Sequence, residues 1–299
     1  MSSKTCIIIC GPTASGKTSL AIRLAQQLNT SIISADSRQC FRELDIGVAR
    51  PSEEELAVVK HYFIASHSIH DEINASVFEQ FALQAAEEIF SKNDVAVMVG
   101  GTGLYINAFC NGMDDIPAVP KAISNELEKN YNENGLAWLQ EEISRRDPQY
   151  ATGGEMHNPH RLLRALGVML ASGRSIREFQ KGKTVARPFR IIKAGLDIPR
   201  SVLYERINRR VDGMMEAGLL KEAEQLYPYR YLKALQTVGY TELFDYFDNK
   251  HSLETAISLI KQNTRHYAKR QLTWFRKDPS VQWKEHWAAE QLLGVGGEW

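Results

Sequence analysis

Two hydrophobic patterns alternate along the first hundred residues. Continuous apolar runs occupy 5–10 (TCIIIC), 31–35 (SIISA), 61–65 (HYFIA) and 95–101 (VAVMVGG). Short runs of this kind are typical of strands that are buried on both faces. We therefore predict four strands in this part of the chain.

Helical periodicity fills the intervals between these runs. Apolar residues at 20, 21, 24, 25 and 28 form one stripe of a helix after the first run. A capping box formed by Ser76 and Glu79 predicts a second helix that extends to about Lys92. Strands that alternate with helices predict an α/β fold with a parallel, doubly wound sheet.

The pattern changes after about Asn111. Residues 113–190 contain helical stretches punctuated by prolines and no clear strand, whereas 189–199 (FRIIKAGLDIP) predicts one more strand. A long helix is expected from Ser201 to Ala217, and the remainder to 290 is expected to be mostly helical. We predict a core formed by 1–112 and 187–299, with an all-helical insertion domain at 113–186.

Length and composition agree with this architecture and exclude several classes of protein. The 299 residues include 43% hydrophobic and 24% charged residues, as in ordinary globular proteins. The four cysteines form no C-x-x-C pair, which argues against structural zinc and a disulfide framework. No apolar run reaches the roughly 18 residues of a membrane span. We expect a cytoplasmic protein that acts as a monomer without a membrane partner.

The segment GPTASGKT at 11–18 carries the strongest chemical signal. It fits G-x-x-x-x-G-K-[ST], in which backbone amides and a helix N-terminus surround a phosphate chain. Gly11 and Gly16 permit the tight turn, Lys17 adds a positive charge, and the Thr18 hydroxyl can bind Mg²⁺. Because a buried strand precedes the loop and an amphipathic helix follows it, we predict a P-loop NTPase-like core that binds a di- or triphosphate.

Polar residues follow two other strands at the edge of the sheet where ligands bind in parallel folds. Asp36 comes directly after 31–35, where it can accept a proton or bind Mg²⁺, or else cap the next turn. Thr102 lies within GGTGLY at 100–105, a weak motif by itself because glycines often follow strands. In the helix after 200, Arg206 and Arg210 are four residues apart and can bind a diphosphate together.

The net charge of zero conceals an uneven distribution of charges. Nine Lys or Arg residues lie between 161 and 193 against one acid, and six lie between 261 and 277 against none. The second segment also contains aromatic residues, and rings among cations are suited to unpaired bases. We predict binding to an RNA phosphate backbone. We also expect Trp274 or Phe275 to pack into the core.

Together these motifs resemble the tRNA dimethylallyltransferase family. The resemblance follows family order over nearly the whole chain, through GPTASGKT (11–18), DSRQ (36–39), DIG (45–47), GGTGLY (100–105), NPHRLLRAL (158–166), LYERINRRVDGMM (203–215), VGYTEL (238–243) and AKRQLTWFRK (268–277). It implies transfer of the dimethylallyl group from dimethylallyl diphosphate to N6 of the adenosine 3′-adjacent to the anticodon of tRNA, with release of diphosphate. The absence of cysteines near the C-terminus is similar to bacterial members.

The resemblance also implies roles for individual residues. Asp36, Thr102 and Arg210 are the expected catalytic residues, with Asp36 accepting the N6 proton and Thr102 holding the adenine. Mg²⁺ is the expected cofactor, with Thr18 as its ligand. The expected donor-binding residues are Gly11, Thr13, Ala14, Ser15, Gly16, Lys17, Thr18 and Arg206.

The implied RNA partner is the anticodon stem-loop of tRNA, which the insertion domain is expected to contact. The expected tRNA-binding residues are Asp36, Ser37, Arg38, Gln39, Thr102, Asn158, His160, Arg161, Arg164, Gly239, Tyr240, Arg265, Lys269, Arg270 and Arg276. Two alternatives use the same loop: an ATP-dependent small-molecule kinase and an adenylate isopentenyltransferase. Neither alternative accounts for the two basic segments. A third alternative, a non-enzymatic RNA-binding protein that retains the loop without using it, does not account for Asp36 and Thr102 at the strand ends.

Overall fold

A computed structural model describes residues 4–182, 184–288 and 291–292 of the chain. Its centre is a six-stranded sheet in the order β3-β2-β4-β1-β5-β6, in which every paired strand is parallel. The strands are β1 (Thr5–Cys10), β2 (Ile32–Ala35), β3 (His61–Tyr62), β4 (Val95–Gly100), β5 (Arg190–Leu196) and β6 (Val281–Lys284). This sheet confirms the predicted α/β core.

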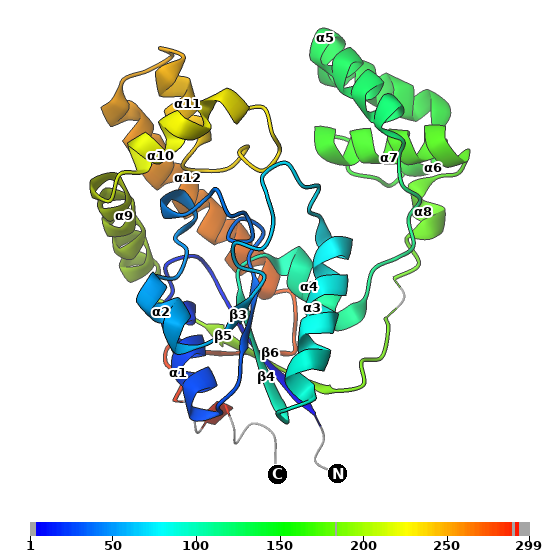
Figure 1. Cartoon of the computed structure of the whole chain (residues 1–299). Coiled ribbons are helices and arrows are strands. Elements are labelled where there is room, and N and C mark those ends of the chain that lie inside the picture. The colour runs from blue at the N-terminus through cyan, green and yellow to red at the C-terminus, as the bar shows by residue number, and fades with distance from the viewer. Residues whose placement is uncertain (1–3, 183, 289–290, 293–299) are drawn as a thin grey trace. The chain divides into compact units, whose positions relative to one another are not determined.

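Helices cover both faces of the sheet because alternate residues of its buried strands point to opposite sides. Ile7 and Ile9 of β1 pack with the helix α1 (Lys17–Gln27), whereas Cys6 and Ile8 join a larger core on the other face. That core includes α3 (Ala75–Phe90) and α4 (Gly103–Asn111), and Figure 1 shows α1 and α3 on opposite sides of the sheet.

The remaining helices extend the same unit or form a second one. In the first unit they are α2 (Glu53–Val58), α9 (Arg200–Glu216), α10 (Leu219–Leu226), α11 (Thr241–Phe247) and α12 (Leu253–Phe275), with single 3₁₀ turns at Ile46–Val48 and Tyr227–Tyr229. In the second they are α5 (Lys121–Arg146), α6 (Pro148–Ala151), α7 (Pro159–Ser172) and α8 (Ile176–Phe179). Gly135, with φ 73°, breaks α5 into two segments.

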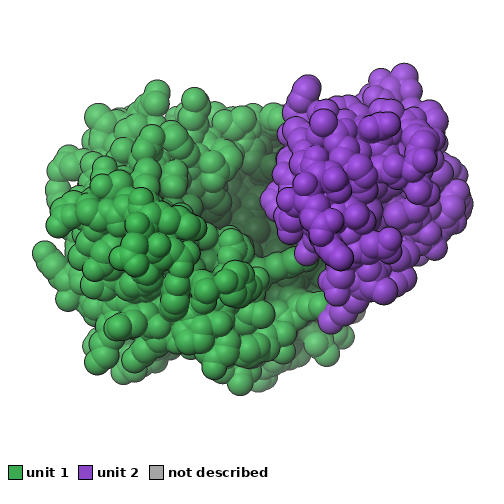
Figure 2. All heavy atoms as spheres, turned by 90° about the horizontal axis from the view of Figure 1, so that it is seen from above, with its two compact units in different colours: residues 1–110, 186–299 green, residues 111–185 purple. Residues whose placement is uncertain are grey.

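The chain divides into two compact units, coloured separately in Figure 2. One consists of Met1–Cys110 and Ala186–Trp299, and the other of Asn111–Val185. The second unit has its own core, in which Leu139 and Ile143 of α5 pack with Leu162 and Leu166 of α7. It is built from helices throughout its described residues.

Three details differ from the sequence-based expectations. The residue that caps α3 is Asn74, which accepts from two amides, so the capping box predicted at Ser76 is wrong. The strand expected at 61–65 ends at Tyr62 because Phe63 and Ala65 have left-handed backbone conformations, with φ of 64° and 46°. The expectation of helices up to 290 missed β6, which extends the sheet beyond β5.

Two further observations bear on the expected class of protein. No helix among the described residues is long and apolar enough to cross a membrane. Lys183, one of the nine cations counted between 161 and 193, lies outside the described residues.

Candidate active site

The loop between β1 and α1 has the backbone of an anion-binding turn. Gly16, with φ 90°, is the N-cap of α1 and provides no side-chain cap for the first helical amides. Ala14 is also left-handed, with φ 63°. Uncapped amides at a helix N-terminus carry partial positive charge and favour an anion. The loop therefore has the geometry predicted for GPTASGKT.

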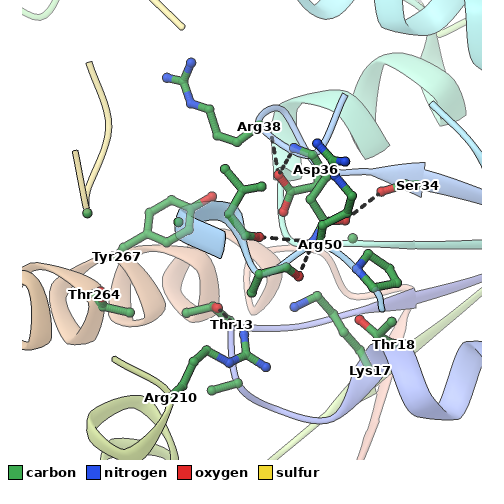
Figure 3. Close-up of a pocket in the computed structure, with 18 of the residues that line it drawn as sticks. Thr13, Lys17, Thr18, Ser34, Asp36, Arg38, Arg50, Arg210, Thr264 and Tyr267 are labelled. Carbon is green, nitrogen blue, oxygen red and sulfur yellow. Dashed lines mark hydrogen bonds between the residues drawn. The ribbon is translucent and has the colours of Figure 1, made fainter. Parts of the chain in front are cut away.

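Lys17 and Arg210 supply the cations beside this loop. Figure 3 shows them reaching toward the same space from α1 and α9. The Lys17 ammonium donates to the Pro12 carbonyl at 3.0 Å, and Arg210 donates to the Thr13 hydroxyl at 3.3 Å. Burial lowers the pKa of Lys17 to about 8 although the Asp36 charge opposes the shift, and burial also lowers the pKa of Arg210.

Asp36 follows β2 and lies at the opposite side of the same cavity. Its Oδ1 accepts from the amides of Arg38 at 2.9 Å and Gln39 at 3.3 Å, which forms a tight turn. The capping alternative is thus correct as a description of Oδ1. It does not exclude a chemical role, because Asp36 lines the cavity and Oδ2 takes no part in those two bonds.

Thr102 and Tyr267 adjoin Asp36. The Thr102 hydroxyl accepts from the Ser37 amide at 3.1 Å, which joins the ends of β4 and β2. Burial and the nearby Asp36 charge raise the pKa of Tyr267 to about 12, against a hydrogen bond with Thr102 that lowers it. The Tyr267 hydroxyl therefore stays protonated at neutral pH.

Lys17, Arg210, Asp36 and Tyr267 line one cavity of about 410 Å³, whereas Thr102 is not among its lining residues. Its wall includes loop residues Lys17 and Thr18, the strand-end residue Asp36, and Arg210 from α9. A stripe on α12 completes the wall with Ile260, Thr264, Tyr267 and Gln271. The spacing of four, three and four residues in that stripe is that of one helix face.

Gln271 is the main residue of this site that the sequence-based reasoning missed. Its side chain is 6% exposed, accepts from the Thr13 amide at 2.8 Å and donates to the Gly101 carbonyl at 3.0 Å. The available signal was the helical spacing from Tyr267, which places both side chains on one face. A single glutamine in a basic segment gave no other indication of its importance.

Arg206, expected to bind the diphosphate together with Arg210, lines a different cavity beside the same loop. It lines a smaller cavity of about 120 Å³ and is 3.5 Å from the Ser15 carbonyl oxygen, the acceptor of its Nη1. The four-residue spacing shifts it by slightly more than one helical turn, about 6 Å, along α9. Arg210 thus lines the larger cavity, and the role of Arg206 in donor binding remains a prediction.

The DSRQ residues line the cavity, but their long side chains are already engaged. Arg38 donates to the carbonyls of Lys233 and Ala234, each at 3.1 Å. Gln39 donates to the carbonyl of Ala49 at 3.0 Å. These bonds hold the loop in place, while Ser37 and Gly239 also line the cavity.

Tyr240 requires a correction. Its side chain is fully buried, and its hydroxyl donates to Glu222 at 2.6 Å. The same carboxylate accepts from the amides of Ile46 at 2.8 Å and Gly47 at 2.9 Å. The ring therefore supports the loop of the DIG motif from inside and is not presented to RNA.

The cations in and just after α12 differ in their contacts with the rest of the protein. Arg265 donates to Asn208 at 2.7 Å, and Arg276 pairs with Asp197 at 2.9 Å. Lys269 and Arg270 are exposed. Phe275 is 3% exposed and Trp274 is 47% exposed, which confirms Phe275 as the core residue of that pair.

The second unit carries the remaining predicted tRNA-binding residues on α7. Asn158 is the N-cap of this helix and accepts from the Arg161 amide at 3.3 Å. His160, Arg161 and Arg164 are exposed, and Arg164 also donates to the Pro117 carbonyl at 3.3 Å. Their contact with tRNA remains a prediction.

The residues of the cavity fit a Mg²⁺ ion that takes most of its ligands from water and substrate phosphate. Thr18 and Asp36 both line it, but the described residues contain no group of three or more His, Cys, Asp or Glu side chains that could hold a metal ion. Mg²⁺ at phosphate sites keeps water and substrate phosphate oxygens as most of its ligands. A single hydroxyl beside a phosphate loop fits that arrangement.

Comparison with known sequences gives one consistent result. A family model described as IPP transferase matches residues 39–278. The tRNA dimethylallyltransferase of Christiangramia forsetii is 50% identical over 279 residues, which cover 93% of this chain and 92% of that protein. The tRNA dimethylallyltransferase of Cytophaga hutchinsonii is 45% identical over 280 residues, with coverage of 94% and 92%.

Solved structures agree with the sequence matches. The full-length tRNA isopentenylpyrophosphate transferase of Bacillus halodurans is 36% identical, with a TM-score of 0.71 and coverage of 98% of this chain and 94% of that chain. A eukaryotic dimethylallyltransferase acting on tRNA is 26% identical, with a TM-score of 0.76 and coverage of 91% and 70%.

Proposed function

Because the chain belongs to the IPP transferase family, we propose that it transfers the dimethylallyl group of dimethylallyl diphosphate to N6 of the adenosine 3′-adjacent to the anticodon of tRNA. One observation carries the assignment to this site. A single cavity brings the phosphate loop and Arg210 together with Asp36. A group transfer needs its leaving-group site and its proton acceptor in one enclosure, and this cavity provides both.

The phosphate loop holds the leaving group in this proposal. The bond between C1 of the donor and its oxygen breaks, and the diphosphate departs with the electron pair. Amides from Ala14 to Thr18, the Lys17 ammonium and Arg210 face the departing charge. Preorganised donors of this kind contribute about 3–4 kcal/mol each to lowering an activation barrier. Bound Mg²⁺, with Thr18 as a ligand, would supply further neutralisation of that charge.

Asp36 accepts the proton that the adenine N6 loses in the transfer. The N6 nitrogen forms its bond to C1 and becomes acidic, and its proton passes to Oδ2 of Asp36. The turn at Arg38 and Gln39 fixes the carboxylate through Oδ1. Thr102, joined to the same turn through the Ser37 amide, positions the adenine.

The acceptor base reaches this cavity only after it leaves the RNA stack. Unstacking costs a few kcal/mol, which contacts between protein and backbone must offset. Exposed cations on α12 and α7 are suited to that task, and both helices contribute to the predicted contact with the anticodon stem-loop. We expect the protein to bind tRNA as a monomer.

One incubation tests the proposal against its alternatives. The protein is mixed with Mg²⁺, tRNA and dimethylallyl diphosphate carrying a labelled prenyl group, without ATP. The expected result is label in the tRNA, located at N6 of the adenosine beside the anticodon. Label in free adenylate instead would support an adenylate isopentenyltransferase. ATP turnover without labelled RNA would support a small-molecule kinase and overturn the proposal.

A further inference from the structure

Gln271 connects two segments of the site that are far apart in the sequence. Its Oε1 accepts from the Thr13 amide of the phosphate loop at 2.8 Å, and its Nε2 donates to the Gly101 carbonyl after β4 at 3.0 Å. Both atoms of one buried amide are thus satisfied by backbone groups. The side chain sets the separation between the loop and the end of β4.

The fit at Gly101 is tight. A Cβ atom at this position would lie 2.2 Å from Gln271 Nε2, whereas the nearest atom outside Gln271 is the Gly11 carbonyl oxygen at 3.4 Å. Glycine at 101 therefore leaves room for the glutamine amide. The steric restriction comes from this one side chain, which makes it testable by a pair of substitutions.

The hydrogen bond between Gln271 and Thr13 also determines which amides of the loop can bind an anion. Because the Thr13 amide donates to Gln271, it is already engaged at the base of the turn. The amides from Ala14 onward are those that remain for an anion. Thr13 itself stays fixed, and its hydroxyl accepts from Arg210 at 3.3 Å. Gln271 thereby places both the loop and the partner of Arg210.

We propose that Gln271 is a positioning residue that aligns the leaving-group site with the acceptor-base site. This inference rests on the proposed prenyl transfer. The phosphate loop holds one reactant, and Gly101 is adjacent to Thr102, which holds the other. Displacement of reacting atoms by about 1 Å can lower a rate by about a hundredfold. A bridge between the two holders therefore acts on the rate without touching either reactant.

The first test is Gln271→Ala, measured in single turnover with both substrates saturating. We expect the transfer rate to fall about 10- to 100-fold, while the Kd for tRNA changes by less than about twofold. Gln262→Ala is the matched control, since Gln262 is an exposed glutamine of the same helix. Its rate is expected to equal that of the unmodified protein.

The second test uses the contact at Gly101 and does not depend on the stability of one variant. Gly101→Ala alone should displace the Gln271 amide and slow transfer at least as much as Gln271→Ala. In the double variant the new methyl group has space, so its rate should match that of Gln271→Ala within about twofold. Rate losses that multiply in the double variant would overturn the inference.

The outcomes distinguish this inference from the proposed function. If the unmodified protein labels no tRNA, the proposed function fails. If it labels tRNA and Gln271→Ala does so at an unchanged rate, only the positioning role fails. A variant that loses tRNA affinity and thermal stability while keeping its transfer rate would show a purely structural role, which also overturns the inference.

Discussion

Helix α12 presents two faces of different composition. Ile260, Thr264, Tyr267 and Gln271 line the cavity. Lys269 and Arg270, between and beside them in sequence, are exposed to solvent. The first face ends in a buried glutamine whose two polar atoms are bonded to backbone. The second face carries charges at the surface.

The difference separates two kinds of effect. Polar groups in the cavity are held by internal bonds, and displacing them changes the geometry of the reacting groups. Exposed cations attract the RNA backbone through solvent, and removing them changes affinity and its dependence on salt. Substitutions on the cavity side should therefore lower the rate, whereas those on the outer face should weaken binding.

The largest expected effect is on Asp36, which lines the same cavity. Asp36→Ala should lower the single-turnover rate at least about a hundredfold, because the N6 proton loses its acceptor. The tRNA Kd should stay unchanged in a filter-binding measurement. Intact turnover would remove Asp36 from its proposed role.

A matched variant separates the two uses of this carboxylate. Asp36→Asn keeps an oxygen that can accept from the Arg38 amide, but it removes the basic carboxylate. We expect its rate to be as low as that of Asp36→Ala. Recovery of most of the rate in Asp36→Asn would show that the turn, and not proton transfer, is what the reaction requires.

The next effect depends on the charge of Lys17. Burial lowers its pKa to about 8, so the free protein carries this charge below pH 8 and loses it above. Donor binding needs the charged form. We therefore expect kcat/KM for dimethylallyl diphosphate to fall by up to about tenfold per pH unit above that pKa, because it reports ionisations of the free enzyme.

A control for this pH dependence is Lys17→Arg, whose guanidinium stays charged across the same range. We expect the decline of kcat/KM that is tied to a pKa near 8 to be absent in this variant, whatever its absolute value. An identical decline in both proteins would assign the titration to another group.

Local patterns in the sequence were sufficient for much of the fold. The runs that become β1, β2 and β4 are buried throughout, and β5 keeps a recognisable apolar run although it contains Arg190 and Lys193. The loop motif after β1 fixes its own backbone conformation. β6 escaped prediction because only two of its four residues (VQWK) are apolar, and its pairing with β5 joins distant parts of the chain.

Local sequence patterns predicted even less of the site than of the fold. Residue types and strand ends were enough to predict that Lys17, Thr18 and Asp36 line a common cavity. They could not reveal that Arg206 lines a second cavity beside the loop or that Tyr240 is buried, since both depend on how separate helices pack. The double contact of Gln271 is likewise a tertiary feature with no local signature.

On the outer face, the charge reversal of Lys269 and Arg270 should act on binding. We expect the K269E/R270E variant to bind tRNA about tenfold more weakly at moderate salt, with a salt slope shallower by about two, since each phosphate contact contributes about 0.9. Lys92→Glu, at an exposed site after α3, is the control for a charge change elsewhere. An unchanged slope would place the RNA on another surface.

The smallest expected effect distinguishes two cations of the basic segment in and just after α12. Arg276 is bonded to Asp197 at 2.9 Å, with side-chain exposures of 59% and 44%, whereas Arg270 lies over the Tyr267 ring at 5.8 Å. An exposed pair of this kind is worth at most about 1 kcal/mol, but Asp197 still cancels part of the field that RNA would feel. Arg276→Ala should weaken tRNA binding by no more than about twofold, less than Arg270→Ala, and Asp197→Asn should strengthen it slightly. A larger effect of Arg276→Ala would contradict this expectation. It would mean that RNA displaces Asp197 and binds Arg276 directly, so that the ion pair of the free protein does not predict which arginine contributes more to tRNA binding.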